Sequence, residues 1–364
     1  MHILICPDKF KASLTAQEAA EAIASGILAK RKKSTIQIVP LADGGEGTLE
    51  MIQNMHGGEW LTHTVNDPLG RPVDARYLWL ADQKTAYIEM ARCSGLQLLT
   101  TKERNPLKTN TFGTGELIQH AAKQGATTIV LTIGGSATND AGIGMAAALG
   151  YSFLDASGNT LDPIGENLAH VAEIKGGNPF PNIEFIVLTD VDNPLHGPQG
   201  AAHVFAKQKG ANVTSIKQLD KGLINIAKWL PANVPGAGAA GGLGAGAMHF
   251  LDAQLTSGAE WLLSKIHFDR AIRKADFIIT GEGKIDGQTW SGKLVAHVVE
   301  RANKQFKQSI LVCGTFEDEQ QIPLFMDERD IFSIMQEAKN EADAMKNAAS
   351  YLHDIGEKIA LKYL

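Results

Sequence analysis

The sequence predicts an α/β protein with two domains, one of them built around a doubly wound parallel sheet. Two observations lead to this prediction. Short apolar runs alternate with helical patterns at both ends of the chain, as expected when helices connect parallel strands. The 364 residues suit two domains better than one, and 44% of them are hydrophobic, which allows a sizeable core in each domain.

The N-terminal region has a β-α-β-α pattern. A short buried strand is expected at residues 3–6, followed by a helix that opens at Thr15. Thr15 and Glu18 have the spacing of a capping box, in which each residue satisfies a free backbone N–H group. A second strand at residues 36–39 and a second helix from Gly47 complete this region.

The pattern changes after about residue 57. Residues 59–89 consist of short extended segments separated by turns at 67–70 and 81–82, which is typical of paired strands. Further along, the sequence predicts helices near 115–124, 140–149 and 216–230, and strands at 129–133 and 185–188.

The β-α pattern returns from about residue 271. Strands are expected at 277–279, 310–312 and 331–334, with a helix after Ser291 and a long C-terminal helix. Together with the N-terminal pair, these strands are enough for one parallel sheet. We therefore predict a discontinuous domain of residues 1–57 and 271–364, into which residues 58–270 are inserted as a mixed α/β domain.

Composition excludes several classes of protein. The net charge is −6, which argues against general nucleic-acid binding. The least polar stretch, 234–251, is mostly Gly and Ala and lacks the bulky apolar residues of a membrane helix. Cys6, Cys93 and Cys313 are far apart and lack zinc-site spacing, so buried free thiols and a cytoplasmic location are expected. A homodimer remains open.

Most of the chemistry lies in six clusters rich in Gly, Asp, Thr and Lys. Glycine allows the backbone to approach a ligand, N–H groups at helix starts attract anions, and carboxylates hold Mg²⁺ or accept a proton. We therefore expect a phosphorylated, acidic ligand, bound between the two domains that supply the clusters. The clusters are residues 7–11, 43–48, 134–140, 189–194, 235–246 and 280–286.

The cluster at 134–140 follows a predicted strand and opens a predicted helix. Gly134 and Gly135 offer flexible N–H groups, and polar side chains follow at Ser136, Thr138 and Asn139. This arrangement favours a phosphate or carboxylate. The alternative is an ordinary strand-to-helix turn in which a polar residue caps the helix.

Asp190 and Asp192 lie just beyond the carboxyl end of a predicted buried strand. Ligands bind at this end in open α/β sheets. The alternative is that both side chains only cap a turn before Pro194.

Two glycine motifs match known nucleotide-binding patterns incompletely. Gly236, Gly238 and Gly241 fit GxGxxG, but no strand is predicted before them, which disfavours dinucleotide binding. A loop that lets the backbone or a ligand approach closely is preferred. Whether this loop binds phosphate stays open. Lys293 completes a GxxxxGK pattern, but Leu294 stands where a P-loop needs Ser or Thr to hold Mg²⁺. Lys293 therefore has two interpretations, a phosphate contact or a surface lysine.

Two further clusters follow the first two strands. Lys9 and Lys11 come just after the first strand, where they are placed to bind an anion. The second strand is followed by an acid-and-glycine cluster with the same design, made of Asp43, Gly44, Gly45 and Glu46.

The ordered motifs PDKFKxSLTA, LADGGEGT, GTGELI, GGSATNDAGIG, TDVDNPLxGPxGA, PGAGAAGGLG and TGEGKIDGQT resemble the type-1 glycerate kinases of bacteria. The similarity runs from Pro7 to about Gly314. It implies a two-domain α/β fold with a flavodoxin-like (Rossmann-like) domain, and phosphorylation of D-glycerate by ATP with Mg²⁺. The implied product is 2-phosphoglycerate, in glycerate, glyoxylate and sugar-diacid catabolism.

Phosphoryl transfer needs anchored phosphates, a cation and an oriented hydroxyl group. On this chemistry we expect Asp190 and Lys9 to be catalytic, and Asp192 and Asp286 to bind the metal. Glycerate binding is assigned to Lys11, Asp43, Gly44, Gly45, Glu46 and Arg71. ATP binding is assigned to Gly134, Gly135, Ser136, Thr138, Asn139, Gly236, Gly238, Gly241, Gly281 and Lys293.

Other functions remain as alternatives. Within kinases, the acceptor is a related hydroxy acid or the product is 3-phosphoglycerate. Outside kinases, the alternatives are a nicotinamide-dependent oxidoreductase, suggested only by GxGxxG, and a non-catalytic protein that binds small organic acids.

Overall fold

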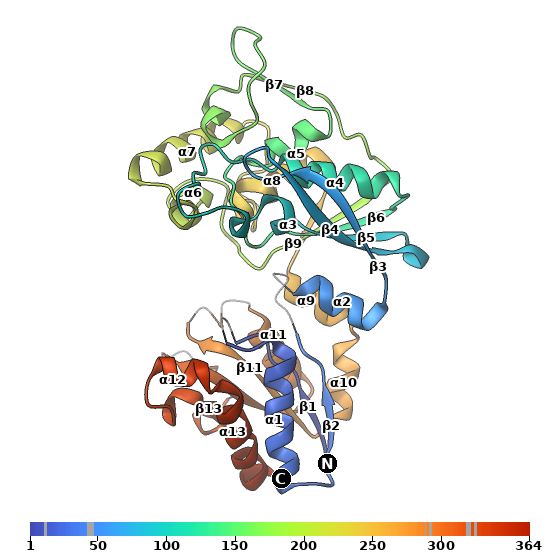
Figure 1. Cartoon of the computed structure of the whole chain (residues 1–364), viewed down its shortest axis with the longest axis vertical. Coiled ribbons are helices and arrows are strands. Elements are labelled where there is room, and N and C mark those ends of the chain that lie inside the picture. Colours follow the sequence, from blue (N-terminus) through green and yellow to red (C-terminus); the bar gives the residue numbers. More distant parts are fainter. Residues whose placement is uncertain (11–12, 42–46, 288, 291–292, 318–321, 324–325) are drawn as a thin grey trace. The chain divides into compact units, whose positions relative to one another are not determined.

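The computed structural model describes residues 1–10, 13–41, 47–287, 289–290, 293–317, 322–323 and 326–364. The chain forms two compact units (Figure 1). The terminal unit combines Met1–Asp43 with Ala259–Leu364, and the central unit is Gly44–Gly258. In the described part of the chain, no helix is both long and apolar enough to cross a membrane.

The terminal unit contains a five-stranded parallel sheet in the order β13-β12-β11-β1-β2. Strands from the two ends of the chain pair directly, because Ile3 of β1 lies opposite Phe277 of β11. This confirms the predicted doubly wound sheet and its flavodoxin-like order, with the change of direction between β1 and β11. The strands are β1 (His2–Ile5), β2 (Thr35–Ile38), β11 (Phe277–Ile285), β12 (Gln308–Phe316) and β13 (Ile331–Ser333).

Helices cover both faces of this sheet. On one face, Ile5 and Val312 pack with apolar residues of α1 and α13, and on the other Leu4 and Ile278 pack with α9, α10 and α11. The predicted capping box begins α1, since the backbone N–H of Glu18 donates to Oγ1 of Thr15. The helices are α1 (Ala16–Lys30), α9 (Gly258–Lys265), α10 (Phe268–Lys274), α11 (Leu294–Lys304), α12 (Glu341–Lys346) and α13 (Ala348–Tyr363); the short 3₁₀ turns are η6 (Glu328–Asp330) and η7 (Ile334–Gln336).

The central unit contains a mixed six-stranded sheet in the order β10-β9-β6-β5-β4-β3. Strands β3, β4 and β5 pair antiparallel, and the turn at Asp67 joins β3 to β4 as predicted. The remaining pairs are parallel. The strands are β3 (Glu59–Asn66), β4 (Pro72–Leu80), β5 (Thr85–Glu89), β6 (Thr128–Thr132), β9 (Glu184–Leu188) and β10 (Gln254–Thr256); β7 (Ser152–Leu154) and β8 (Glu173–Lys175) form a separate hairpin.

One large core joins this sheet to its helices. Leu131 and Val187 pack with Leu117 of α4, Met145 of α5 and Leu243 of α8. The helices are α2 (Thr48–His56), α3 (Ala91–Ser94), α4 (Phe112–Lys123), α5 (Ile143–Ala148), α6 (Ala201–Phe205), α7 (Val213–Ile226) and α8 (Ala239–Leu251); the 3₁₀ turns are η1 (Ala81–Gln83), η2 (Leu96–Leu98), η3 (Gly165–His170) and η4 (Lys207–Lys209).

The compact units divide near residues 43 and 258, whereas the sequence-based limits are 57 and 270. The difference lies in two helices. Helix α2 contacts β4 and β5 of the central sheet, and its Glu50 pairs with Arg76 of β4 at 3.2 Å. Helix α9 places Ala259 and Leu263 in the core of the terminal unit. The domain limits at residues 57 and 270 stay a prediction.

Candidate active site

The clusters at 134–140 and 189–194 begin side by side at one edge of the central sheet. β6 and β9 are parallel neighbours, with Thr132 opposite Leu188 at their carboxyl ends. The chain therefore leaves both strands at the same edge, which is where open α/β sheets bind ligands. The sequence placed each cluster after a strand, and the pairing of the two strands brings them together.

The third glycine-rich segment, 236–246, packs against both of these clusters. The N–H of Gly238 donates to the carbonyl oxygen of Asn193 at 2.9 Å, and the N–H of Ala141 donates to the carbonyl oxygen of Gly241 at 3.0 Å. A Cβ added at Gly241 would lie 2.1 Å from the carbonyl oxygen of Thr138, and Gly241 has φ +72°. Glycine at this position is thus required by backbone packing, whether or not a ligand binds there.

The same segment disfavours the dinucleotide interpretation. Gly236 and Gly238 follow helix α7 and a loop, whereas the fingerprint needs a strand immediately before its first glycine. Residues 240–242 all have positive φ, so the motif forms an irregular turn at the start of α8. GxGxxG at 236–241 therefore lacks the structural context of a nucleotide fold.

The 134–140 turn presents its two glycines to solvent and buries its polar side chains. Gly134 and Gly135 are exposed, whereas Ser136, Thr138 and Asn139 are buried. Oγ1 of Thr138 and both polar side-chain atoms of Asn139 have no hydrogen-bond partner among the described residues. Unpartnered buried polar atoms are costly, so a cluster of them is unusual for an ordinary strand-to-helix turn.

The carboxylate of Asp140 occupies the start of the following helix. Its Oδ2 accepts hydrogen bonds from the N–H and hydroxyl of Thr111 at 2.8 and 2.7 Å and from the N–H of Gly144 at 3.1 Å, while Oδ1 accepts from the N–H of Gly142 at 3.3 Å. Burial raises the pKa of this carboxyl group. The predicted helix at 140–149 is shortened to α5, whose first N–H groups donate to the carbonyl oxygen of Asp140 (Ile143), to the side chain of Asp140 (Gly144) and to the hydroxyl of Thr111 (Met145).

Lys209 is a residue of this site that the sequence did not reveal. It is 1% exposed, and its Nζ donates to Oγ of Ser136 at 2.7 Å and to the carbonyl oxygen of Thr138 at 2.6 Å. Burial lowers the pKa of its amino group to about 7, and the charge of Asp140 acts in the opposite direction. No sequence pattern distinguishes Lys209 from the exposed Lys207 of the same turn.

Asp190 is half-buried two residues after β9. Its Oδ1 accepts a hydrogen bond of 2.9 Å from the hydroxyl of Ser257, which directly follows the neighbouring strand β10. Asp192 is exposed, and the side-chain amide of Asn193 donates to the carbonyl oxygen of Gln199 at 2.8 Å. The sequence did not single out Ser257, because nothing near it in the chain indicates chemistry.

The terminal unit places Asp8 and Lys9 at the point where its strand order reverses. The N–H of Asp8 donates to the carbonyl oxygen of Gly281 in β11 at 2.8 Å, and Oδ1 of Asp8 accepts from the N–H of Lys9 at 2.7 Å. β11 runs to Ile285, past the predicted end at 279, so Gly281 lies inside the strand. Lys11, Asp43, Gly44, Gly45 and Glu46 lie outside the described residues.

The structure gives two other predicted site residues, Arg71 and Asp286, ion-pair partners and places a third, Lys293, next to a helix. The guanidinium of Arg71 pairs with Asp67 and Glu103, both at 2.6 Å. Asp286 lies 3.6 Å from Nζ of Lys284, and Lys293 immediately precedes α11. Among the described residues, no three His, Cys, Asp or Glu side chains are grouped so that they could hold a metal ion.

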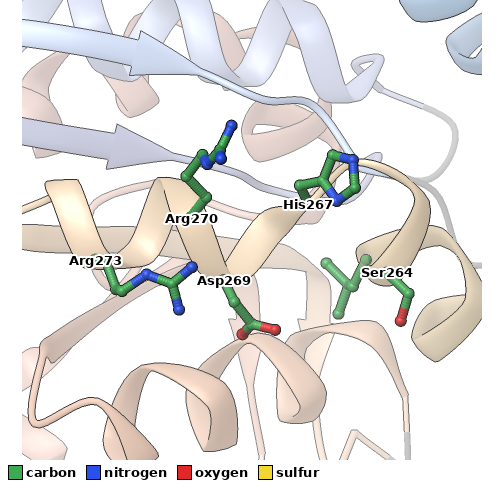
Figure 2. A pocket seen from close by; sticks show the side chains of 6 residues that line it. Ser264, His267, Asp269, Arg270 and Arg273 are labelled. Carbon is green, nitrogen blue, oxygen red and sulfur yellow. The ribbon is translucent and has the colours of Figure 1, made fainter.

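The structure also describes the three cysteines and a surface pocket of the terminal unit. Cys6, Cys93 and Cys313 are buried free thiols, as predicted, and burial raises the pKa of Cys93 to about 11. A pocket of about 420 Å³ lies beside α10 and includes Arg270 and Arg273. Figure 2 shows that the side chain of Arg270 points away from that of Arg273, so the two do not converge on one point.

Comparisons with known proteins agree with the motif series. Residues 3–364 match the family model described as the glycerate kinase family. A glycerate kinase of Halalkalibacterium halodurans is 40% identical over 369 residues, covering 99% of this chain and 97% of that protein. The glycerate 2-kinase of Escherichia coli K12 is 42% identical over 333 residues, covering 88% and 86%.

A solved structure supports the fold along the whole chain. The crystal structure of a "putative glycerate kinase 2" from Salmonella typhimurium LT2 superposes with a TM-score of 0.81 at 37% identity, covering 99% of this chain and 97% of that one. Fold, motif order and full-length similarity therefore agree: this chain belongs to the glycerate kinase family.

Proposed function

We propose that this protein transfers the γ-phosphoryl group of ATP to D-glycerate, giving 2-phospho-D-glycerate and ADP. The proposal is carried by the convergence of the 134–140 turn, the Asp190 segment and the 236–246 loop at one sheet edge. A relative 42% identical to this chain is named glycerate 2-kinase, which supports the 2-phosphate as product.

Asp190 is the proposed acceptor of the proton from the attacking hydroxyl group. A general base must have a fixed orientation toward the proton it takes. The hydroxyl of Ser257 donates to one carboxylate oxygen of Asp190 and so restricts rotation of the carboxylate. Phosphoryl transfer depends mainly on positioning and charge stabilisation, so this restraint has a direct catalytic value.

The backbone N–H groups of the two exposed glycines, Gly134 and Gly135, are the proposed phosphate-binding part of the 134–140 turn. Ser136, Thr138 and Asn139 are buried, so we assign them to shaping the turn or to contacts that form when ATP is bound. Gly236, Gly238 and Gly241 support the turn through backbone packing. Lys9 and Lys11 remain candidates for the γ-phosphate or the glycerate carboxylate.

The carboxylates present fit a magnesium ion brought with the nucleotide. Mg²⁺ in kinases is held by one or two carboxylates together with phosphate oxygens and waters. The exposed carboxylate of Asp192 meets this requirement, and Asp286 is a second candidate despite its neighbour Lys284. Bound Mg²⁺ supplies positive charge that offsets the charge developing on the phosphates.

We also propose where the protein is located and what it binds. Three free, buried cysteines fit a reducing compartment, so we propose a cytoplasmic location. The small-molecule substrate is D-glycerate, and neither nucleic acid nor membrane is required.

A coupled assay tests reaction and product together. The protein is incubated with ATP, Mg²⁺ and a panel of hydroxy acids, and ADP release is measured. With D-glycerate, we expect a product that enolase consumes directly. Consumption only after a phosphoglycerate mutase is added would assign the 3-phosphate, and faster turnover of another acid would assign a different acceptor. Binding of glycerate without ADP release would indicate a non-catalytic binder, and NAD(P)H oxidation would indicate a dehydrogenase.

A further inference from the structure

We propose that Lys209 is a positioning residue for the reaction, whose buried amino group holds the 134–140 turn from beneath in the shape that binds phosphate. The inference rests on the proposed role of this turn in binding ATP. Lys209 lies 73 residues from Ser136 in the sequence, so the contact is made entirely by tertiary structure.

The two hydrogen bonds of Lys209 fix the turn at two points. Nζ donates to the side chain at position 136 and to the main chain at position 138, so the backbone on both sides of Ala137 is held. Ala137 itself makes two further hydrogen bonds. Its N–H donates to the carbonyl oxygen of Ser94 at 2.9 Å, and its carbonyl oxygen accepts from the hydroxyl of Thr109 at 2.8 Å. The side chain of Lys209 links the turn to the segment after α6.

The backbone around Lys209 is fixed by hydrogen bonds and by packing in the core. The N–H of Lys209 donates to the carbonyl oxygen of Ala206 at 3.0 Å, and the N–H of Ala211 donates to the same oxygen at 3.1 Å. Ala206 and Ala211 are both buried in the main core of the central unit. The amino group is therefore preorganised, and its hydrogen bonds cost little further ordering.

Burying the amino group of a lysine costs free energy, because the group loses its contact with water. Removing an amino group from water disfavours its charged form, which explains the lowered pKa of Lys209. Titratable groups with strongly shifted pKa values next to a candidate site are more often functional than those elsewhere. An apolar side chain of similar length would fill the same space without this cost, but it would leave the hydroxyl of Ser136 and the carbonyl oxygen of Thr138 without this donor.

The two glycines proposed to bind phosphate come immediately before the residues that Lys209 contacts. Gly134 and Gly135 are exposed directly before the residues that Lys209 holds. A loop that binds phosphate through backbone N–H groups must keep those groups oriented before the ligand arrives. Lys209 does not need to touch ATP to matter, because a small displacement of the turn changes the direction of the N–H groups.

The test compares Lys209→Met with Lys207→Met. Lys207 lies in the same 3₁₀ turn and is exposed, so its variant controls for the loss of one lysine. We expect Lys209→Met to weaken binding of a non-hydrolysable ATP analogue and to raise KM for ATP, each by roughly tenfold, the usual scale for losing a hydrogen bond to a group that can be charged. KM for glycerate should change less than twofold, and Lys207→Met should match the wild type.

A double-mutant cycle separates positioning from a direct role of Ser136. If Lys209 acts through Ser136, the losses in Lys209→Met and Ser136→Ala should not add in the double variant. Independent contributions would give additive losses. Where Lys209→Met does not fold, Ser136→Ala, a smaller change, carries the test through its own affinity for the ATP analogue.

Three results would overturn the proposal. One is a folded Lys209→Met with unchanged affinity for the analogue and unchanged KM for ATP. The second is a lower melting temperature with no change in either constant, which is the behaviour of a purely structural lysine. The third is full additivity in the cycle. Absence of ADP release by the wild type with glycerate would instead contradict the proposed function, while analogue binding would still test Lys209.

Discussion

The hydroxyl of Ser257 donates a hydrogen bond of 2.9 Å to Oδ1 of Asp190. The two residues follow neighbouring parallel strands, and the N–H of Thr189 donates to the carbonyl oxygen of Thr256 at 3.0 Å, which extends the pairing past the strand ends. The pairing of β9 with β10 therefore places Ser257 where its hydroxyl can hold the carboxylate of Asp190.

Asp190→Asn should lower kcat by roughly 100-fold or more, because it keeps the size of the side chain and removes the proton acceptor. KM for glycerate and the melting temperature should change little, since a turn Asn replaces a turn Asp well. Steady-state kinetics and thermal unfolding check this. Normal kcat with a small loss of stability would show that Asp190 only caps the turn, and recovery of kcat at high Mg²⁺ would make it a metal ligand.

Ser257→Ala should reduce kcat less than Asp190→Asn does, by roughly three- to tenfold, because losing one hydrogen bond relaxes the carboxylate without removing it. Ser264→Ala, an exposed serine in α9, is a suitable control. Ser257→Ala combined with Asp190→Asn should be no slower than Asp190→Asn alone. An additional loss in the double variant would give Ser257 a role of its own.

The stability contributed by Lys209 should depend on pH. Its folded pKa of about 7 lies below the value of about 10.4 expected when unfolded. Between these values the unfolded state binds the proton and the folded state does not, so stability rises with pH. Relative to Lys209→Met, the wild type should gain up to about 1.4 kcal/mol per pH unit from pH 7 to 9.

Urea unfolding of the wild type, Lys209→Met and Lys207→Met at pH 7, 8 and 9 measures this difference directly. Other titrating groups cancel between the proteins, and Lys207→Met should follow the wild type. A difference between wild type and Lys209→Met that stays constant over this range would mean that the folded pKa of Lys209 is not lowered.

Gly241→Ala should be strongly destabilising, by roughly 3 kcal/mol or more, because the new Cβ would meet the carbonyl oxygen of Thr138 and the backbone has positive φ. Gly125→Ala is the matched control: Gly125 has φ +92° with no atom within 4 Å of an added Cβ, so it measures backbone strain alone. Equal losses of unfolding free energy in the two variants would contradict the packing role of Gly241.

Arg71→Met should leave KM for glycerate within about twofold of the wild type, because the guanidinium is already paired with Asp67 of the β3–β4 turn and with Glu103, which lies after η2. A small loss of thermal stability is expected from the same contacts. A tenfold or larger rise in KM for glycerate, without a comparable change for ATP, would restore Arg71 as the residue that binds the substrate carboxylate.

The sequence by itself determined the elements and the class of fold. Apolar periodicity and the capping box at Thr15 are local signals, so they located α1 and the five strands of the terminal sheet. The order of the glycine and acid clusters identified the family, because a series of motifs is specific even when each motif is weak. Placing Asp190 beyond a strand end also needed only local information.

Tertiary structure decided which residues meet. Lys209 and Ser136 are 73 positions apart and Ser257 and Asp190 are 67 apart, and no local pattern encodes either pair. The tertiary structure also distinguishes glycines that are needed for backbone packing from glycines that are exposed to solvent, which the sequence alone does not. Gly241 faces another backbone segment and Gly134 faces solvent, and this distinction arises only when the strands pair and the loops after them are packed together.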